Sequence, residues 1–392
     1  MKLSIEQVDV GGRRVFLRAD LNAPLERGAV SDDTRLTAVL PTIRHLLDRR
    51  AAVVLASHLG RPKGGPDAKL SLRPVAERLG ALLERPVPLA PDCVGEAVED
   101  LARALKPGET LLLENLRFHP EEEANDDGFA RRLAALADVY VNDAFAAAHR
   151  AHASIAAITR HLQPAAAGLL MRRELEALGR ILESPARPLA AVLGGAKVSD
   201  KIALVEHLLG RVDVLVIGGG MAFTFLRALG HGVGKSLVEA DRIETARATL
   251  EAARRRGAQI VLPVDALVAG GLDSPSGRAV SVRDIPAEQM GLDIGPLTVE
   301  RFAAALKSAK TIVWNGPMGV FEKPAFATGT VALARAVAEA DAFSVIGGGD
   351  TVAAVNQAGV ADRIGYISTA GGAFLEFLEG RTLPGVDALT EA

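Results

Sequence analysis

The chain has 392 residues, of which 49% are hydrophobic, so it is long enough to form two domains with substantial cores. Only 4% of its residues are aromatic and its net charge is −3, so we expect no binding to nucleic acid or to an anionic membrane. The single cysteine, Cys93, excludes an internal disulfide and a multi-cysteine metal site. The sequence shows no apolar leader and no apolar run of bilayer length, so we expect a cytoplasmic protein.

Short apolar runs alternate along the chain with helical stretches rich in Ala, Leu and Arg. The expected strands are 15–18, 52–57, 110–114 and 138–142, followed by 189–194, 212–218, 259–263, 311–315, 342–346 and 364–368. The helices expected between them include 72–83, 128–136 and 200–209. This alternation, with continuously apolar strands, predicts an α/β fold of doubly wound (Rossmann-like) parallel sheets with helices on both faces.

A long helix at 168–182, followed by the breaker segment 183–188, divides the chain near its middle. We therefore expect a first lobe over residues 1–167, a connection over 168–186 and a second lobe from 187 onwards, with a cleft between the lobes. In open α/β sheets, ligands bind beyond the carboxyl ends of the strands. The residues that follow each strand are therefore the candidates for function.

Basic side chains follow each of the first four strands. They are Arg18, then His58 and Arg61, then Arg117, then His149, Arg150 and His152, and Arg35 begins a helix. In a parallel sheet these groups would meet at one edge, where they suit a phosphorylated or carboxylated small anion. A single loop arginine is more often a solvated surface charge, so this inference depends on the group as a whole.

Two further features of the first lobe leave alternatives open. Asp20 and Asn22 are as well suited to capping a turn as to accepting hydrogen bonds from a substrate hydroxyl. The histidines of the 149–152 segment are three residues apart with no carboxylate or cysteine nearby in the sequence, which favours ordinary loop histidines over a zinc site.

Glycine, lysine and aspartate mark the strand ends of the second lobe. Lys197 and Lys201 follow the Gly194-Gly195 turn and are four residues apart on a nascent helix, so we expect them to share a face. Two interpretations of this pair remain open: a phosphate lies between the two ammonium groups, or both lysines are simply solvated. The glycine runs 218–220, 347–349 and 371–372 each precede a helix and offer free N–H groups to phosphate. Asp350 is a candidate Mg²⁺ ligand or a helix N-cap.

Three familiar motifs are incomplete in this lobe. The segment 230–236 resembles a phosphate-binding P-loop, but Leu229 replaces its first glycine and the segment follows a helix instead of a strand. Phe223 and Val352 interrupt the dinucleotide-binding fingerprint, which disfavours a dehydrogenase. No G-x-S-x-G segment supports a serine hydrolase.

A dozen segments between residue 18 and about residue 380 resemble the phosphoglycerate kinase family, in the family's order. They are RADLNAP, DDTR, SHLGRP, LSLRPVAERLG, ENLRFHPEEE, DVYVNDAF, AHRAHAS, LGGAKVSDKI, GGGMAFTF, IVWNGPMGVFE, GGGDT and STAGGAFLEFLEG. The resemblance implies a monomeric glycolytic enzyme that moves a phosphoryl group reversibly between 1,3-bisphosphoglycerate with ADP and 3-phosphoglycerate with ATP, with Mg²⁺. It also implies that the second lobe ends at 379 and that residues 380–392 return to the first lobe.

The resemblance further implies the residues of each site. The phosphoglycerate site would comprise Asp20, Leu21, Asn22, Arg35, His58, Leu59, Gly60, Arg61, Arg117 and Arg150. The nucleotide site would comprise Lys201, Gly291, Asn315, Glu322, Gly348, Gly349, Asp350 and Thr351, with Glu322 at the ribose and Asp350 at the Mg²⁺ ion. The catalytic groups around the moving phosphoryl group would be Arg35, Lys197, Lys201, Gly371 and Gly372, brought together by hinge closure.

The chain departs from the family's pattern at three places. Ala370 replaces the first glycine of STGGGA, keeping an N–H donor but resisting positive φ. Phe374 stands where a small polar residue is usual, and Ala146–Ala148 replace a Gly-Thr segment. These departures concern loop geometry and rate. A two-lobe protein that binds a phosphorylated metabolite without chemistry remains the alternative function, against which the lysine pair and Asp350 argue.

Overall fold

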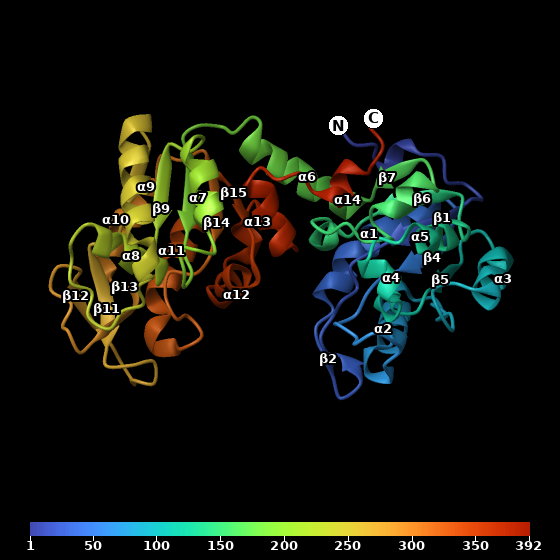
Figure 1. The fold of residues 1–392 in the computed structure, drawn as a ribbon, viewed down its shortest axis with the longest axis horizontal. Helices are drawn as coiled ribbons and strands as arrows, with labels where there is room; N and C mark the ends of the chain where they lie inside the picture. The colour runs from blue at the N-terminus through green and yellow to red at the C-terminus, as the bar shows by residue number, and fades with distance from the viewer. The chain divides into compact units, whose positions relative to one another are not determined.

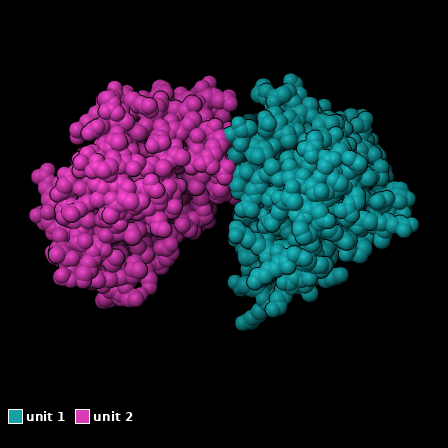
Figure 2. Space-filling view, in the orientation of Figure 1, with its two compact units in different colours: residues 1–176, 382–392 teal, residues 177–381 magenta.

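The computed structural model describes residues 1–392, which form two compact units (Figures 1 and 2). Unit 1 comprises Met1–Glu176 and Thr382–Ala392, and unit 2 comprises Ala177–Arg381. Helix α6 (Leu169–Leu182) contains the boundary, so its first half belongs to unit 1 and its second half to unit 2. None of the helices is both long and apolar enough to cross a membrane.

Unit 1 is built on a five-stranded parallel sheet in the order β5-β4-β1-β6-β7. These strands are β1 (Arg14–Arg18), β4 (Ala52–Ala56), β5 (Thr110–Leu112), β6 (Val139–Asn142) and β7 (Ala165–Ala167). The chain adds β4 and β5 on one side of β1 and then returns to add β6 and β7 on the other side. The strand order therefore reverses between β1 and β6, the point at which such sheets bind ligands.

A small hairpin and six helices complete unit 1. The hairpin strands are β2 (Leu25–Glu26) and β3 (Ala29–Val30), and the helices are α1 (Thr34–Asp48), α2 (Arg73–Leu83), α3 (Glu96–Ala104), α4 (Pro120–Glu123), α5 (Asp127–Ala134) and α14 (Pro384–Asp387). The C-terminal segment joins the edge of the sheet, where the Thr390 N–H donates to the Ala165 carbonyl at 2.9 Å. A continuous core of buried Val, Leu, Ile and Ala side chains joins the sheet to α1 and α2.

Unit 2 contains a six-stranded parallel sheet in the order β10-β9-β8-β14-β15-β16. The strands are β8 (Leu189–Leu193), β9 (Val214–Ile217), β10 (Gln259–Val261), β14 (Thr311–Asn315), β15 (Phe343–Ile346) and β16 (Tyr366–Ile367). The strand order reverses between β8 and β14. The ends of these two strands are level, because Asn315 pairs with Leu193, so the loops that follow them start side by side.

A second, antiparallel sheet of three strands, in the order β12-β11-β13, belongs to unit 2. It consists of β11 (Asp265–Ala269), β12 (Arg278–Ser281) and β13 (Met290–Ile294). The helices of the unit are α7 (Ile202–Leu209), α8 (Met221–Ala228), α9 (Ile243–Arg256), α10 (Pro296–Leu306), α11 (Thr328–Glu339), α12 (Gly349–Gln357) and α13 (Gly372–Leu378).

The prediction of two doubly wound parallel sheets is confirmed. Each of the ten expected strands has a counterpart, although most are shorter than expected by one to three residues. The sequence analysis missed β7, the β2–β3 hairpin and the whole antiparallel sheet.

Candidate active site

The first candidate site lies at the strand-order reversal of unit 1 and is centred on Arg18, the last residue of β1. Its side chain is fully buried, and its Nε donates to Ser154 Oγ at 2.9 Å. Its Nη2 lies 3.2 Å from Nδ1 of His58, because Arg18 is level with Ala56 in the sheet and His58 follows two residues later. The ends of two neighbouring strands therefore bring a guanidinium and an imidazole together.

A buried carboxylate compensates this buried cation. Glu122, in α4, is fully buried and accepts hydrogen bonds from the Ser154 N–H at 2.9 Å and from its hydroxyl at 2.6 Å. Burial raises the pKa of Glu122, and the charge of Arg18 opposes this rise. Because a buried charge without a partner is strongly destabilising, Glu122 and Ser154 are what allow Arg18 to stay in the sheet.

The loops after β1 and β4 are fastened to each other by hydrogen bonds. The Asn22 side-chain carbonyl accepts from the Gly60 N–H at 2.9 Å, and the Gly60 carbonyl accepts from Arg117 Nη1 at 2.9 Å. Gly60 has φ +59, and a Cβ there would overlap the Leu70 side chain, so the loop requires glycine. The segment that we expected to contact a substrate is therefore fastened by side chains from two neighbouring loops.

Asp20 and Asn22 form the turn that the sequence allowed, and Asp20 also has a second structural role. Asp20 Oδ1 accepts from the Asn22 N–H at 3.2 Å, which forms the turn. Its Oδ2 accepts from Arg35 Nη1 at 2.5 Å, which positions the half-exposed Arg35 side chain at the start of α1. A direct contact of either residue with substrate stays a prediction.

The two histidines of this site are neutral. Burial, reinforced by the positive charge of Arg18, lowers the pKa of His152 to about 3 and lowers that of His58 well below its ordinary value. His152 Nδ1 lies 3.8 Å from Glu122, a carboxylate that the local sequence does not reveal. His58 and His152 therefore add no positive charge to that of the arginines.

The arginines differ in how far the protein already engages them. Arg117 forms an ion pair with Glu123 at 3.1 Å, and Arg35 pairs with Asp20. Arg150 only donates to the neighbouring His149 ring at 3.1 Å, and the exposed Arg61 makes no ion pair or hydrogen bond with the protein. The site thus combines fixed and uncommitted guanidinium groups, as expected of a receptor for a multiply charged small anion.

The second candidate site lies where the strand order of unit 2 reverses, between β8 and β14. The Gly194 N–H donates to the Asn315 carbonyl at 3.0 Å, and the Gly195 N–H donates to the Pro317 carbonyl at 2.9 Å. A Cβ on Gly194 would overlap the Pro317 carbonyl. Glycine is therefore required for the loops after the two strands to pack this closely.

Lys201 is a buried ammonium group beside this crossing. Its Nζ donates to Asn315 Oδ1, and Asn315 Nδ2 donates to the Gly347 carbonyl at 2.7 Å. Burial lowers the pKa of Lys201 from 10.5 to about 8, against the opposing charges of Asp200, Asp350 and Glu379. A cation held in this way, with only neutral hydrogen-bond partners, favours the arrival of an anion.

The prediction that Lys197 and Lys201 share a helix face is wrong. Helix α7 begins at Ile202, so both lysines precede it, and Lys201 occupies the N-cap position. Lys197 is exposed, whereas Lys201 is 9% exposed. The two residues therefore differ in environment, and a plain solvated lysine face is excluded for Lys201.

The glycine run before α12 forms a helix N-terminus next to Asn315. Gly348 is its N-cap with φ +93, and Thr351 Oγ1 accepts from the Gly316 N–H at 2.7 Å. The N-cap alternative for Asp350 is wrong, because Asp350 lies in the first helical turn. Its carboxylate is exposed and has no hydrogen-bond or ion-pair partner in the protein.

A pocket of about 400 Å³ lies beside these loops. Of the residues implied by the resemblance, Gly291, Glu322 and Asp350 line it, whereas Lys201, Asn315 and Thr351 lie behind it around the helix N-terminus. Its apolar lining, which the sequence analysis missed, includes Phe223, Leu237, Met290, Leu292, Met318 and Val320. The sequence analysis identified Phe223 only as the residue that interrupts the dinucleotide-binding fingerprint.

Two of the departures from the family's pattern can be described locally. Ala370 keeps its N–H donor, as expected, and this N–H donates to Ser368 Oγ at 3.2 Å, while the φ of Ala370 is not positive. Phe374 is fully buried and its ring occupies the space beside Gly347. Gly371, the N-cap of α13, and Gly372 are both exposed.

Unit 1 thus carries an arginine-rich candidate site whose chemistry suits a small anion, and unit 2 carries a pocket with an apolar slot, a helix N-terminus, a buried lysine and an uncommitted carboxylate. These features are typical of a kinase that transfers phosphate from a nucleotide to a small metabolite.

Comparison with known proteins gives the particular family. The family model described as "Phosphoglycerate kinase" matches residues 5–381. Phosphoglycerate kinase of Moorella thermoacetica is 57% identical over 392 residues, covering 100% of this chain and 99% of its own, and that of Desulforudis audaxviator is 58% identical with 99% of both chains covered. The solved structure of phosphoglycerate kinase from Coxiella burnetii matches with a TM-score of 0.92 and 44% identity, covering 99% of this chain and 98% of that chain. The chain belongs to the phosphoglycerate kinase family.

Proposed function

We propose that this chain, as a phosphoglycerate kinase, uses the two sites described above for the two substrates of the family's reaction. The reaction transfers a phosphoryl group reversibly between 1,3-bisphosphoglycerate and ADP, giving 3-phosphoglycerate and ATP. The observation that carries the assignment of sites is their chemical difference: unit 1 offers guanidinium groups at its strand-order reversal, and unit 2 offers an apolar slot ending at a helix N-terminus.

In unit 1, the phosphoglycerate contacts three kinds of group. The uncommitted Arg61 and Arg150, together with Arg117, bind the phosphate or carboxylate oxygens. Neutral His58 and the loop Asp20–Asn22 hydrogen-bond the remaining polar atoms, and the backbone of Leu59 and Gly60 closes the side of the site. Arg35 is kept for the oxygens of the group being transferred.

In unit 2, the base of the nucleotide occupies the apolar slot bounded by Gly291. The exposed Glu322 accepts hydrogen bonds from the ribose hydroxyls. The phosphates approach Lys201, Asn315 and the N–H groups of Gly348, Gly349 and Thr351, because a helix N-terminus attracts anions.

Asp350 fits the ligand that a Mg²⁺ ion needs here. Mg²⁺ in nucleotide sites is held by one or two carboxylates, with phosphate and water completing its octahedron. Asp350 is such a carboxylate, exposed and without a protein partner at the mouth of the phosphate-binding helix. When bound, the ion neutralises charge on the nucleotide phosphates.

The catalytic groups act by positioning and charge stabilisation. The acceptor is a carboxylate or a diphosphate, so no strong general base is required. Arg35, Lys197 and Lys201, with the N–H groups of Gly371 and Gly372, stabilise the charge on the moving phosphoryl oxygens. Because the two substrates bind to different units, turnover requires a hinge-closed state in which water is excluded. We further propose that the enzyme acts as a monomer in the cytoplasm, a reducing compartment that suits its free thiol, Cys93.

Kinetics of Arg35→Ala, with MgATP and 3-phosphoglycerate, test this proposal. We expect kcat to fall by about 10²–10³, the usual effect of losing one preorganised donor, with the Kd for MgATP unchanged. Arg44→Ala is the matched control, because Arg44 lies on the same helix and bonds only the Leu82 carbonyl at the surface. Equal losses in turnover and in nucleotide affinity would contradict the role of Arg35. Tight binding of both substrates by the folded wild-type protein without turnover would favour the non-catalytic alternative.

A further inference from the structure

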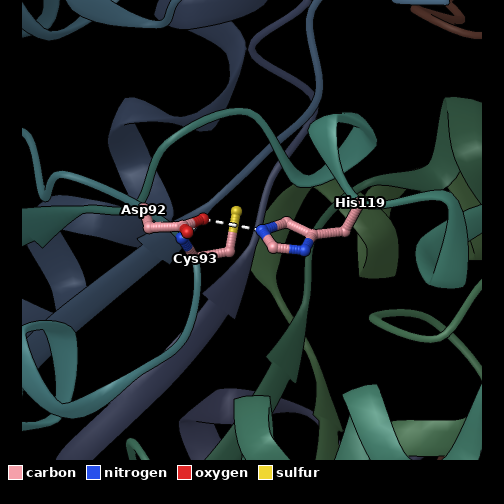
Figure 3. A group of neighbouring side chains, drawn as sticks. All are labelled: Asp92, Cys93 and His119. Carbon is pink, nitrogen blue, oxygen red and sulfur yellow. Dashed lines mark hydrogen bonds and ion pairs between the residues drawn. The ribbon is translucent and has the colours of Figure 1, made fainter. Parts of the chain in front are cut away.

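A cluster of three possible metal ligands lies in unit 1, outside both substrate sites. Figure 3 shows the Asp92 carboxylate, the Cys93 thiol and the His119 imidazole facing one another. One ligand atom from each lies within 4.8 Å of the other two. The carboxylate and the imidazole are already in contact, with Asp92 Oδ1 2.6 Å from His119 Nε2. None of these residues belongs to the proposed phosphoglycerate or nucleotide site.

The backbone holds the first two ligands in place. The segment before them runs along β5, where the Ala90 N–H donates to the Leu112 carbonyl at 2.8 Å and the Leu112 N–H donates to the Pro88 carbonyl at 2.8 Å. The Cys93 N–H donates to Asp92 Oδ1 at 2.6 Å, and the thiol is fully buried and points at the Glu114 carbonyl, 2.9 Å away. These bonds fix the backbone positions from which the Asp92 and Cys93 side chains extend.

The third ligand is held from the opposite side by packing. His119 is the N-cap residue of α4, and its ring stacks on Phe129 with the ring centroids 5.0 Å apart. The stacking limits rotation of the imidazole, so its Nε2 stays directed at Asp92. The donors therefore converge from two separate segments of the chain.

The donor set selects the class of ion. Nitrogen, sulfur and carboxylate oxygen in one cluster suit Zn²⁺ and related thiophilic metals, whereas Mg²⁺ and Ca²⁺ prefer oxygen ligands alone. Three protein ligands leave one tetrahedral position for water. A pocket of about 650 Å³ lined by Asp92 and His119 provides space for that water, and Asp67 and Glu114 line it together with the cationic Arg73.

We propose that Asp92, Cys93 and His119 bind one thiophilic divalent metal ion of the zinc class. On binding, the thiol proton is released to solvent and the sulfur leaves the Glu114 carbonyl to become a thiolate ligand. The ring proton of His119 moves from Nε2 to Nδ1 by exchange with solvent, so that Nε2 ligates as part of a neutral imidazole. The ion then cross-links the loop of Asp92 to the start of α4. That helix carries Glu122, the partner of the buried Arg18, so metal binding stabilises unit 1 next to its anion site.

The unique cysteine makes the test direct. We propose titrating the chelator-treated full chain with Co²⁺, a spectroscopic substitute for Zn²⁺, in buffer without Mg²⁺. One equivalent is expected to give a thiolate-to-cobalt charge-transfer band in the near ultraviolet, which can arise only from Cys93 because the chain contains 1 cysteine. One equivalent of Zn²⁺ is expected to abolish the band and to slow unfolding of unit 1.

The variants separate ligation from other effects. We expect Cys93→Ser to lose the charge-transfer band. His119→Gln and Asp92→Asn should each weaken metal binding by more than roughly 10–100-fold, which is the loss seen when a residue that only orients a metal ligand is removed. His161→Gln is the matched control, because His161 Nε2 also contacts an aspartate, Asp127 Oδ1 at 2.9 Å, but without a thiol; it is expected to bind like the wild type. Kinase activity without added Co²⁺ or Zn²⁺ is expected in every variant and confirms folding. The absence of a band in the active wild-type protein, or wild-type affinity in His119→Gln, would overturn the proposal.

Discussion

Replacing Lys201 with methionine is expected to stabilise unit 2 while disabling the enzyme. The ammonium group is 9% exposed and its hydrogen-bond partner, Asn315, is neutral. The fall of its pKa from 10.5 to about 8 corresponds to about 3 kcal/mol of unfavourable free energy for holding the charge in place. Methionine removes this cost with a side chain of similar length, but it leaves the buried Asn315 Oδ1 without a donor, a loss of about 1–3 kcal/mol. The net gain in the free energy of unfolding is therefore at most about 2 kcal/mol.

The pH dependence of this gain has a definite sign. Below pH 8 the lysine is protonated in both the folded and the unfolded chain, so the cost is complete and the variant gains most. Between about pH 8 and pH 10.5 the folded protein loses the proton while the unfolded chain keeps it, so wild-type stability rises with pH and the gain fades. Catalysis changes in the opposite direction, since losing one charge-stabilising donor lowers kcat by about 10²–10³.

The single tryptophan allows unit 2 to be followed alone. Trp314 is fully buried in β14, so its fluorescence during urea unfolding reports on this unit and avoids treating a two-unit chain as one transition. Unfolding would be compared at pH 7 and pH 10, with Lys307→Met as a control at an exposed lysine of the same unit. A variant less stable than the wild type at pH 7, or a gain that grows with pH, would refute the argument about the buried charge. Turnover within tenfold of wild type would refute the catalytic role.

Two further substitutions test the packing behind each site. Glu122→Gln is expected to destabilise unit 1 by about 1–3 kcal/mol, because the carboxamide nitrogen cannot accept a hydrogen bond and leaves one of the two Ser154 donors unsatisfied in the core. The loss would be measured as faster alkylation of the buried Cys93 thiol in urea. Glu121→Gln, next to it, is expected to change little, and equal rates in the two variants would contradict this. Gly291→Ala is expected to weaken nucleotide binding by about 1–3 kcal/mol, measured by calorimetry, because the new Cβ displaces the Phe223 ring in the pocket. Its affinity for 3-phosphoglycerate should be unchanged, and a parallel loss there would indicate general unfolding.

The parallel sheets could be predicted because their strands are short, continuously apolar and separated by helical segments. The antiparallel sheet of unit 2 carries no such signal. Its strand β11 begins with Asp265, whose carboxylate accepts hydrogen bonds from Thr298, and β13 contains Gly291 and Asp293. A buried aspartate satisfied by residues about 30 positions away cannot be distinguished in the sequence from a solvated one.

The candidate site of unit 1 was also only partly predictable from the sequence. The basic residues that meet there could be predicted, because they follow strands of one parallel sheet and the sheet fixes where each loop begins. The compensating Glu122 could not be identified, because it is the middle residue of three consecutive glutamates that together resemble a solvated acidic turn. The error over Lys197 and Lys201 has a related cause: helix propensity does not fix the first residue of a helix, and a shift of two residues moved Lys201 from a helix face to a buried N-cap.

The two units place their ligand sites at the same topological position but balance charge differently. In unit 1 the deeper arginines already have carboxylate partners, with Arg18 near Glu122 and Arg117 paired with Glu123. In unit 2 Lys201 has no ion pair, so a phosphate is the first group to compensate it closely. A ligand that stabilises the protonated lysine must raise its pKa, against the burial that lowers it in the free protein. Nucleotide binding should therefore be accompanied by proton uptake above about pH 8. Phosphoglycerate binding should involve no such uptake in this pH range, because its arginines stay protonated and the neighbouring His152 stays neutral.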